Sequence, residues 1–244
     1  MNIEALTDTG RVRKINEDSF KTYVSDEYSY AIVADGMGGH LAGEVASKMA
    51  VDIISEYICK NLSCDLDRFQ VREVVHKAFM KANIEIYEYS CNNERVMGMG
   101  TTATLVMIYK GYLIYAHVGD SRAYKISDKI TQITRDHSYV QELVKLGQIT
   151  PEEAKHHPRR NYITRAMGVE ETVRVDMGVK EYKGEKILIC SDGLYGQIED
   201  EELLCEINSA PIKDSIGVLI DKANERGGAD NITAVIMEEG RTDA

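Results

Sequence analysis

The sequence predicts an α+β fold in which antiparallel sheet is covered by helices. Short strand-like runs gather in the middle and at the end of the chain, with helical patterns between them. The helices do not alternate regularly with the strands, as they would in a doubly wound parallel sheet. Hydrophobic residues make up 43% of the 244 residues, which is enough for a globular core.

The first half of the chain contains one clear strand and two helices. The run Tyr28–Ala34 is rich in β-branched and aromatic residues and ends at Asp35-Gly36, which is a typical turn dipeptide. Apolar residues then recur at three- and four-residue steps over Ala42–Tyr57, which predicts a helix. The same periodicity predicts a second helix over about Phe69–Tyr89.

The second half is rich in strands that turn signals such as Lys110-Gly111 separate, as in an antiparallel meander. Residues 137–165 are predicted as an irregular, partly helical excursion. No repeat, low-complexity segment or linker interrupts the pattern, so residues 1–244 are predicted to form one domain. The predicted strands are Thr102–Tyr109, Tyr112–Val118, Ser121–Ile126, Thr172–Val179, Lys186–Ser191 and Ile232–Glu238, with a helix at Ile212–Glu225.

Charge and cysteine content exclude several classes of protein. The net charge of -11 argues against a nucleic-acid or membrane-surface binder, because both need a basic face. The 5 cysteines are odd in number and form no CxxC pair, so a reducing cytosol is the simplest interpretation. The start MNIEALTDTG lacks the pattern of a signal peptide, and no apolar run is long enough to span a bilayer. The sequence therefore predicts a cytoplasmic protein.

Four aspartates follow or precede buried-looking strands: Asp35, Asp120, Asp192 and Asp230. Each alone is most simply a turn residue. If the four strand ends face one side, however, the carboxylates converge, and like charges at that range cannot all stay ionised without a partner. A bound divalent cation resolves this conflict, and oxygen ligands favour Mg²⁺ or Mn²⁺ over zinc or copper. Glycine at Gly36 would let a backbone carbonyl join the ligands.

A second charged group lies near the N-terminus, at Arg13, Glu17 and Asp18. One interpretation is an exposed charge run. The other is functional, with Arg13 as a bidentate phosphate clamp and the two acids orienting waters around a metal ion.

Eight short blocks occur in a fixed order between Thr7 and Thr233. They are Arg13-x-x-Asn16-Glu17-Asp18, Val33–His40, Gly43–Ser47, Gly98–Ala103, Val118–Arg122, Asp136–Ser138, Ser191–Leu194 and Asp230–Thr233. Any one block is a weak signal, whereas the ordered set is specific. Together the blocks resemble the metal-dependent protein phosphatase (type 2C) family in its bacterial, stand-alone form.

The resemblance implies a fold and a set of metal ligands. The fold would be a four-layer α-β-β-α sandwich, with two central antiparallel sheets flanked by helices. Asp35 would bridge two metal ions, and the Gly36 carbonyl would bind one of them. Asp192 and Asp230 would complete the first site, and Asp120 with Asp192 would form a third site.

The resemblance also implies that Glu17 and Asp18 lie in the water-mediated shell of the metals and that residues 137–165 form a mobile flap. The implied activity is hydrolysis of phosphoserine and phosphothreonine in proteins by a metal-activated water, with two or three Mn²⁺ or Mg²⁺ ions. Its substrates would be phosphorylated proteins, including a serine/threonine kinase of the same cell and that kinase's targets. Nothing in the sequence suggests an obligate partner, so a monomer is expected.

The general acid stays open. Many eukaryotic family members carry His directly after the Asp-Gly, but here that position is Met37. His40 could serve instead, or a metal-bound water could. Two alternative functions make different predictions about the sequence. A catalytically silent relative that binds phosphoproteins would lack metal aspartates, and a phosphatase acting on an anti-sigma antagonist would usually carry a sensor domain. A cysteine phosphatase is excluded because no Arg closes the loop after Cys190.

Overall fold

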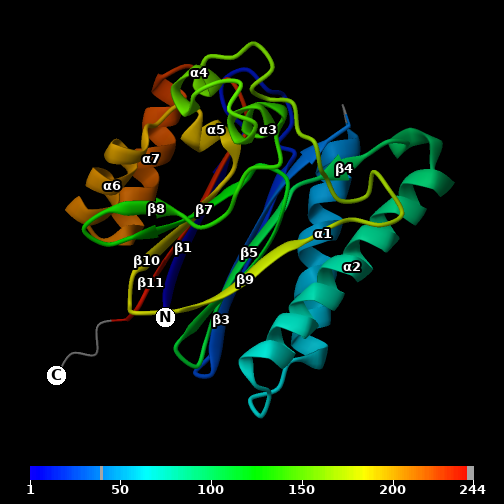
Figure 1. The fold of residues 1–244 in the computed structure, drawn as a ribbon, viewed down its shortest axis with the longest axis vertical. Coiled ribbons are helices and arrows are strands. Elements are labelled where there is room, and N and C mark those ends of the chain that lie inside the picture. The colour runs from blue at the N-terminus through cyan, green and yellow to red at the C-terminus, as the bar shows by residue number, and fades with distance from the viewer. Residues whose placement is uncertain (39–40, 241–244) are drawn as a thin grey trace.

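Two antiparallel sheets lie face to face at the centre of the molecule, and helices cover their outer faces (Figure 1). The computed structural model describes residues 1–38 and 41–240. The first sheet has the order β1-β11-β10-β7-β8, and the second has the order β2-β3-β5-β6-β9, with β4 paired to β3. The strands are β1 Asn2–Asp8, β2 Asp18–Val24, β3 Tyr28–Met37, β4 Gly100–Thr101, β5 Ala103–Tyr109, β6 Tyr112–Val118, β7 Arg122–Ile126, β8 Ile130–Gln132, β9 Asp176–Glu181, β10 Lys186–Cys190 and β11 Ile232–Glu238.

The long helices α1 and α2 pack on the sheet that contains β3, and α5, α6 and α7 cover the other sheet (Figure 1). The short helices α3 and α4 lie at the upper end of the view, beside α5. None of the described helices is long and apolar enough to cross a membrane. The helices are α1 Leu41–Asn61, α2 Arg68–Asn92, α3 Tyr139–Lys145, α4 Pro151–Lys155, α5 Asp192–Tyr195, α6 Asp200–Ser209 and α7 Ile212–Glu225, with a 3₁₀ turn at Glu94–Val96.

The buried apolar residues form three layers, and β3 contributes to two of them. Tyr30 and Ile32 face α1 and α2. Ala31 and Val33 point the other way, into the layer between the two sheets. Successive side chains of a strand point to opposite faces, so a strand buried on both faces is a continuous apolar run. This double burial explains why the sequence predicted β3 so clearly.

Local signals set the ends of several elements. Asp67 caps α2 by accepting hydrogen bonds from the N–H groups of Phe69 and Gln70, and Gln70 reciprocates in a capping box. The β5–β6 hairpin turns at Lys110 and Gly111, which have φ values of 46° and 77°. Two positive φ values are the mark of the turn that matches the twist of a two-residue hairpin.

The predicted fold class is confirmed, and strands β6 and β11 and helix α7 have the predicted bounds. Two predictions were wrong. Asp35-Gly36 is not a turn, because Gly36 and Met37 continue β3 and pair with Thr101 and Gly100. The strand predicted at Thr172–Val179 begins only at Asp176. Among the longer elements, strands β1 and β2 and helix α6 were not predicted.

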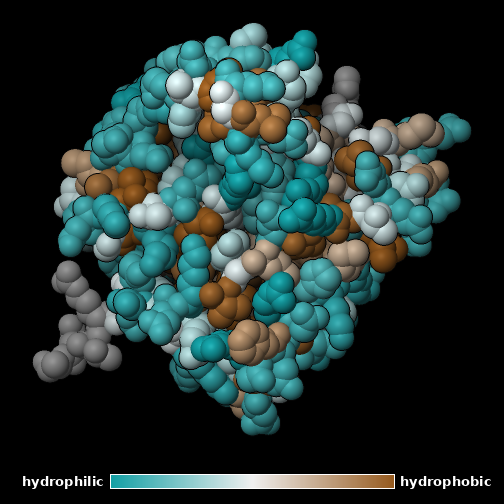
Figure 2. All heavy atoms as spheres, viewed as in Figure 1, coloured by the Kyte–Doolittle hydropathy of each residue, from teal (hydrophilic) through white to brown (hydrophobic). Residues whose placement is uncertain are grey.

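The surface in Figure 2 is mostly hydrophilic, and its hydrophobic residues lie in separate small patches. Scattered apolar residues of this kind are normal for a folded chain and need no special explanation.

Candidate active site

Five aspartates lie at one end of the sandwich. Asp18 opens β2 and is paired with Asp35 near the end of β3. Asp120 follows β6, Asp192 follows β10, and Asp230 precedes β11. Because neighbouring strands run antiparallel, the start of one strand and the end of the next meet at the same edge. The topology therefore carries all five carboxylates, from both sheets, to one place.

The pKa values show that these carboxylates affect one another. Burial raises the pKa of Asp35 well above its usual range, and the negative charges of Asp18, Asp192 and Asp120 raise it further. Burial also raises the pKa of Asp192, with Asp120 and Asp230 as the next causes. Carboxylates that oppose one another's ionisation are close in space. The carboxylates at the strand ends therefore lie near one another.

Two further carboxyl groups are deeply buried. Asp18 is 7% exposed, and burial raises its pKa to about 6 although Ser191 donates a hydrogen bond of 2.6 Å to its Oδ2. Asp120 is 4% exposed, and burial followed by the charge of Asp136 raises its pKa to about 7. Groups perturbed by both burial and charge, gathered at one site, are candidates for function.

Some of the acidic oxygens lack a partner. Oδ1 of Asp18, Oδ1 of Asp192 and Oε1 of Glu17 are buried and accept no hydrogen bond from the described residues. Within the same residues, no three His, Cys, Asp or Glu side chains are drawn together as a preformed ligand set. The acidic side chains thus lie near one another but are not arranged around a single metal position. Unpartnered carboxylate oxygens in an all-oxygen group fit a hard divalent cation such as Mg²⁺ or Mn²⁺.

Arg13 brings a positive charge to this group. Its Nη2 donates to Oδ2 of Asp230 at 2.8 Å, and its Nη1 is 4.0 Å from Oε2 of Glu17. Burial lowers the pKa of Arg13, but Asp230 and Glu17 outweigh that effect and raise it. Its side chain is 47% exposed, so the guanidinium can still reach an anion from solvent. Arg13 and Glu17 therefore lie beside the carboxylate group and are not an isolated charge run.

Residues without an acidic group hold the carboxylates in place, and sequence reasoning assigned them no role. Thr102 accepts the N–H of Asp35 at 2.8 Å and returns its own N–H to the Asp35 carbonyl at 2.8 Å. Asn231 accepts the N–H of Glu17 at 2.8 Å and donates to the carbonyls of Thr9 and Ile15. The only sequence signal for them was their place inside the recognised blocks.

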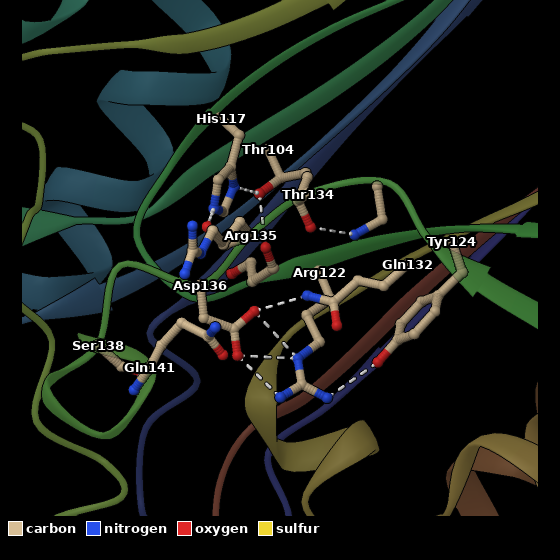
Figure 3. Close-up of polar contacts among 12 residues, drawn as sticks. Thr104, His117, Arg122, Tyr124, Gln132, Thr134, Arg135, Asp136, Ser138 and Gln141 are labelled. Carbon is tan, nitrogen blue, oxygen red and sulfur yellow. Dashed lines mark hydrogen bonds and ion pairs between the residues drawn. The ribbon is translucent and has the colours of Figure 1, made fainter. Parts of the chain in front are cut away.

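Asp120 sits in a turn that is held from its C-terminal side by an ion pair. The guanidinium of Arg122 donates to both oxygens of Asp136, at 2.8 to 3.1 Å, and lies between Asp136 and Tyr124 (Figure 3). Gln132 adds a hydrogen bond of 2.7 Å to Asp136 (Figure 3). Bidentate pairs of this kind fix orientation as well as charge.

Two site glycines are needed because backbone lies against them. A Cβ on Gly36 would come within 2.0 Å of the Gly43 carbonyl oxygen, and a Cβ on Gly193 within 2.0 Å of the Asn231 carbonyl oxygen. The close approach at Gly36 comes from the contact between β3 and α1.

Gly193→Ala is expected to lower the free energy of unfolding by about 1–3 kcal/mol, the usual cost of overpacking. Gly217→Ala is the matched control, since it lies within α7 and, apart from the backbone of its own helix and its chain neighbours, no described atom is within 4 Å of the added Cβ. The free energy of unfolding of the control should increase by up to about 1 kcal/mol, because alanine is more favourable than glycine within a helix. Urea unfolding of both variants measures the difference, and equal stabilities would contradict the packing explanation.

His40 lies outside the described residues, so its predicted role stays a prediction. Met37, which occupies the position of the eukaryotic His, ends β3 and is partly buried. In the segment predicted as a flap, α3 and α4 are connected by short turns, and Ser138 pairs with Ile163 at its base.

Crystal structures of bacterial serine/threonine phosphatases share this fold of two antiparallel sheets flanked by helices. The crystal structure of Stp1 from Staphylococcus aureus superposes with a TM-score of 0.91 at 36% identity, covering 98% of this chain and 94% of that one. The catalytic domain of the phosphatase PstP, solved in complex with two manganese ions, has a TM-score of 0.84 at 35% identity, with 97% of each chain covered.

The protein phosphatase 2C family profile matches residues 10–235. The serine/threonine phosphatase stp of Listeria monocytogenes serotype 4b (strain F2365) is 39% identical over 246 residues, covering 99% of this chain and 97% of that protein. The chain therefore belongs to the protein phosphatase 2C family. It is a protein serine/threonine phosphatase, a hydrolase whose substrates are phosphoproteins.

Proposed function

We propose that this phosphatase depends on two or three Mn²⁺ or Mg²⁺ ions and opposes a serine/threonine kinase of the same cell. The observation that carries the metal part is the group of buried carboxylates with raised pKa values and unpartnered oxygens. The relative PstP, of similar fold, was solved with two manganese ions, which supports the same interpretation.

The proposed ligands are those named from the sequence. Asp35 and the Gly36 carbonyl, with Asp192 and Asp230, would hold two ions, and Asp120 with Asp192 would hold a third. Such ions, when bound, lower the pKa of water towards ~7 and neutralise phosphate charge. Glu17 and Asp18 would lie just outside, where buried acids orient the waters around the ions.

The chain's own residues would position the phosphoprotein. Arg13 is half-exposed at the edge of the acidic group and can turn from Asp230 to a phosphate, with two donors aimed at two oxygens. The leaving serine or threonine oxygen would take its proton from His40 or from water. We further propose that residues 1–244 act as one catalytic domain and one monomer, with residues 137–165 as a flap beside the site.

The direct test is hydrolysis of p-nitrophenyl phosphate and of a phosphothreonine peptide before and after treatment with EDTA. We expect activity to fall to background and to return when Mn²⁺ is added in excess. A kinase-phosphorylated protein from the same cell should lose its phosphate under the same conditions. Activity that survives complete removal of divalent ions would contradict the metal proposal.

Arg13→Ala is expected to raise the KM for a phosphopeptide about tenfold while kcat changes less, because a charge-assisted hydrogen bond contributes about 1.5–3 kcal/mol. Lys14→Ala removes an exposed neighbouring charge and is the matched control. Arg13→Lys keeps the charge but loses the paired donors, so an intermediate KM is expected. Steady-state kinetics at saturating Mn²⁺ measures these values, and an unchanged KM in Arg13→Ala removes Arg13 from the clamp.

A further inference from the structure

His137 is buried, 7% exposed, and hydrogen-bonded to the backbone beside Asp120. The backbone N–H of His137 donates to the carbonyl of Gly119 at 2.7 Å. Its ring nitrogen Nδ1 accepts the N–H of Gly119 at 3.0 Å. One residue therefore binds both polar backbone groups of the glycine that directly precedes Asp120.

Gly119 has no side chain with which to fix its own position. Its φ of +105° is a conformation that other residues rarely adopt, and a Cβ there would come within 2.5 Å of Cγ2 of Thr102. The turn must therefore be held by its hydrogen bonds. His137 supplies two of them, and the pair of Arg122 with Asp136 holds the turn on its other side.

The ring of His137 is fixed by the groups around it. Nδ1 faces a backbone N–H, so it carries no proton, and the neutral ring has its hydrogen on Nε2. Nε2 lies 3.3 Å from Oδ2 of Asp176, so the ring also contacts a carboxylate. Nη1 of Arg165 lies 2.8 Å from Nε2, and Nε2 would accept from it only in the other tautomer. Arg165 instead donates to Oδ1 of Asp176 at 2.9 Å.

The same residue also forms the base of the segment proposed as a flap. The carbonyl of His137 accepts the N–H of Thr164 at 2.8 Å. The next residues continue this pairing, since Ser138 pairs with Ile163 and the N–H of Tyr139 donates to the carbonyl of Tyr162. His137 thus connects the start and end of the segment to the Asp120 turn.

We infer that His137 is a positioning residue that holds the carboxylate of Asp120 in place through Gly119. This inference rests on the proposed function, in which Asp120 and Asp192 share a metal ion. It assigns His137 no contact with substrate or with the reacting atoms. It predicts that Nδ1 of the ring is needed to hold Gly119. It also predicts that Asp176 keeps the ring oriented with its Nε2–H pointing away from Gly119.

Two variants separate the two ends of the ring. His137→Asn places an amide oxygen near the position of Nδ1, so it can still accept the N–H of Gly119. His137→Gln places its amide near Nε2, so it can reach Asp176 but offers no acceptor to Gly119. His156→Gln, at an exposed site of the proposed flap, is the control. Asp176→Ala is a further variant at a more exposed position, in case the buried substitutions fail to fold.

The first measurement is amide hydrogen exchange of Gly119 by NMR in metal-free protein. We expect exchange at least about tenfold faster in His137→Gln than in wild type, consistent with the loss of one buried hydrogen bond. His137→Asn and His156→Gln should stay within about threefold of wild type. The exchange rate in Asp176→Ala should lie between those of wild type and His137→Gln, because the ring can then turn away from Gly119.

The second measurement is the Mn²⁺ concentration that gives half-maximal hydrolysis of a phosphopeptide. His137→Gln should raise it about tenfold, while the KM at saturating Mn²⁺ stays within about twofold. A general loss of structure would change both the half-maximal Mn²⁺ concentration and the KM for the phosphopeptide. Equal behaviour of the Asn and Gln variants, or unchanged Gly119 exchange in the Gln variant, overturns the inference. Because exchange is measured without metal, its result is separate from whether the enzyme needs metal at all.

Discussion

Asp35→Asn and Asp192→Asn are each expected to lower kcat at least about a thousandfold, the upper range for losing one electrostatic contributor in an enclosed site. Each substitution keeps the size of the side chain and removes its charge. Both positions lie in the carboxylate group, and each raises the pKa of neighbouring acids or has its own raised by them. Hydrolysis of a phosphopeptide at saturating Mn²⁺ measures the loss.

Asp26→Asn is the matched control, because Asp26 is an exposed acid in the turn between β2 and β3, far along the strands from Asp18 and Asp35. It should keep nearly all of the activity. Thermal unfolding of the metal-free variants checks that they are folded. A folded Asp35→Asn or Asp192→Asn enzyme that keeps a third of wild-type activity would show that these charges are not essential to the reaction.

The metal-free protein is expected to lose stability as the pH rises from about 4 to about 7. The pKa of Asp18 is about 6 and that of Asp120 about 7, both well above the usual aspartate value of 3.8. The folded state therefore binds more protons than the unfolded state across this window, and the free energy of unfolding falls as pH increases. Ionisation of the carboxylate group above pH 7 is what a bound divalent cation would offset.

Buried histidines oppose this trend at the acidic end. Burial lowers the pKa of His117 to about 3, so the folded state resists a proton that the unfolded state accepts below about pH 6.5. A comparison with Asp18→Asn separates the two effects, since that variant keeps both His117 and the fold. The difference in stability between wild type and variant then reports the effect of the Asp18 carboxylate alone.

Calorimetric scans of metal-free wild type and Asp18→Asn at pH 5 and pH 8 measure this difference. The variant should gain at least about 5 °C over wild type at pH 8 and less at pH 5, since 1 kcal/mol moves Tm by roughly 2–4 °C in a chain of this size. Excess Mn²⁺ at pH 8 should raise the wild-type Tm. A wild type that is more stable than the variant at pH 8 without metal would contradict the repulsion between these carboxylates.

Much of the fold could be predicted because its strongest signals are local. The double burial of β3 gives a continuous apolar run, and α7 has one apolar stripe of buried residues. Strand β1 was missed because it is an edge strand with no fully buried residue, so the run Asn2–Asp8 lacks a strong pattern. The extension of β3 through Gly36 depends on pairing with Gly100–Thr101, which lies more than sixty residues away.

The site was partly predictable for a related reason. Aspartates at strand ends can be recognised in sequence, and the antiparallel topology brings them together. The supporting contacts cannot be recognised in the same way. Thr102, Asn231 and His137 act through backbone groups distant in the chain, so their side chains carry no local sign of what they bind. The resemblance located their blocks without showing these contacts.

Diffraction from a crystal grown with Mn²⁺, with anomalous data, shows whether these carboxylates bind metal ions. We expect at least two anomalous peaks among the carboxylates of Asp35, Asp192 and Asp230, with a weaker peak near Asp120. The same peaks should be missing in crystals of Asp35→Asn. Ordered manganese found only elsewhere on the protein, with these carboxylates empty in an active enzyme, would contradict the proposed metal site.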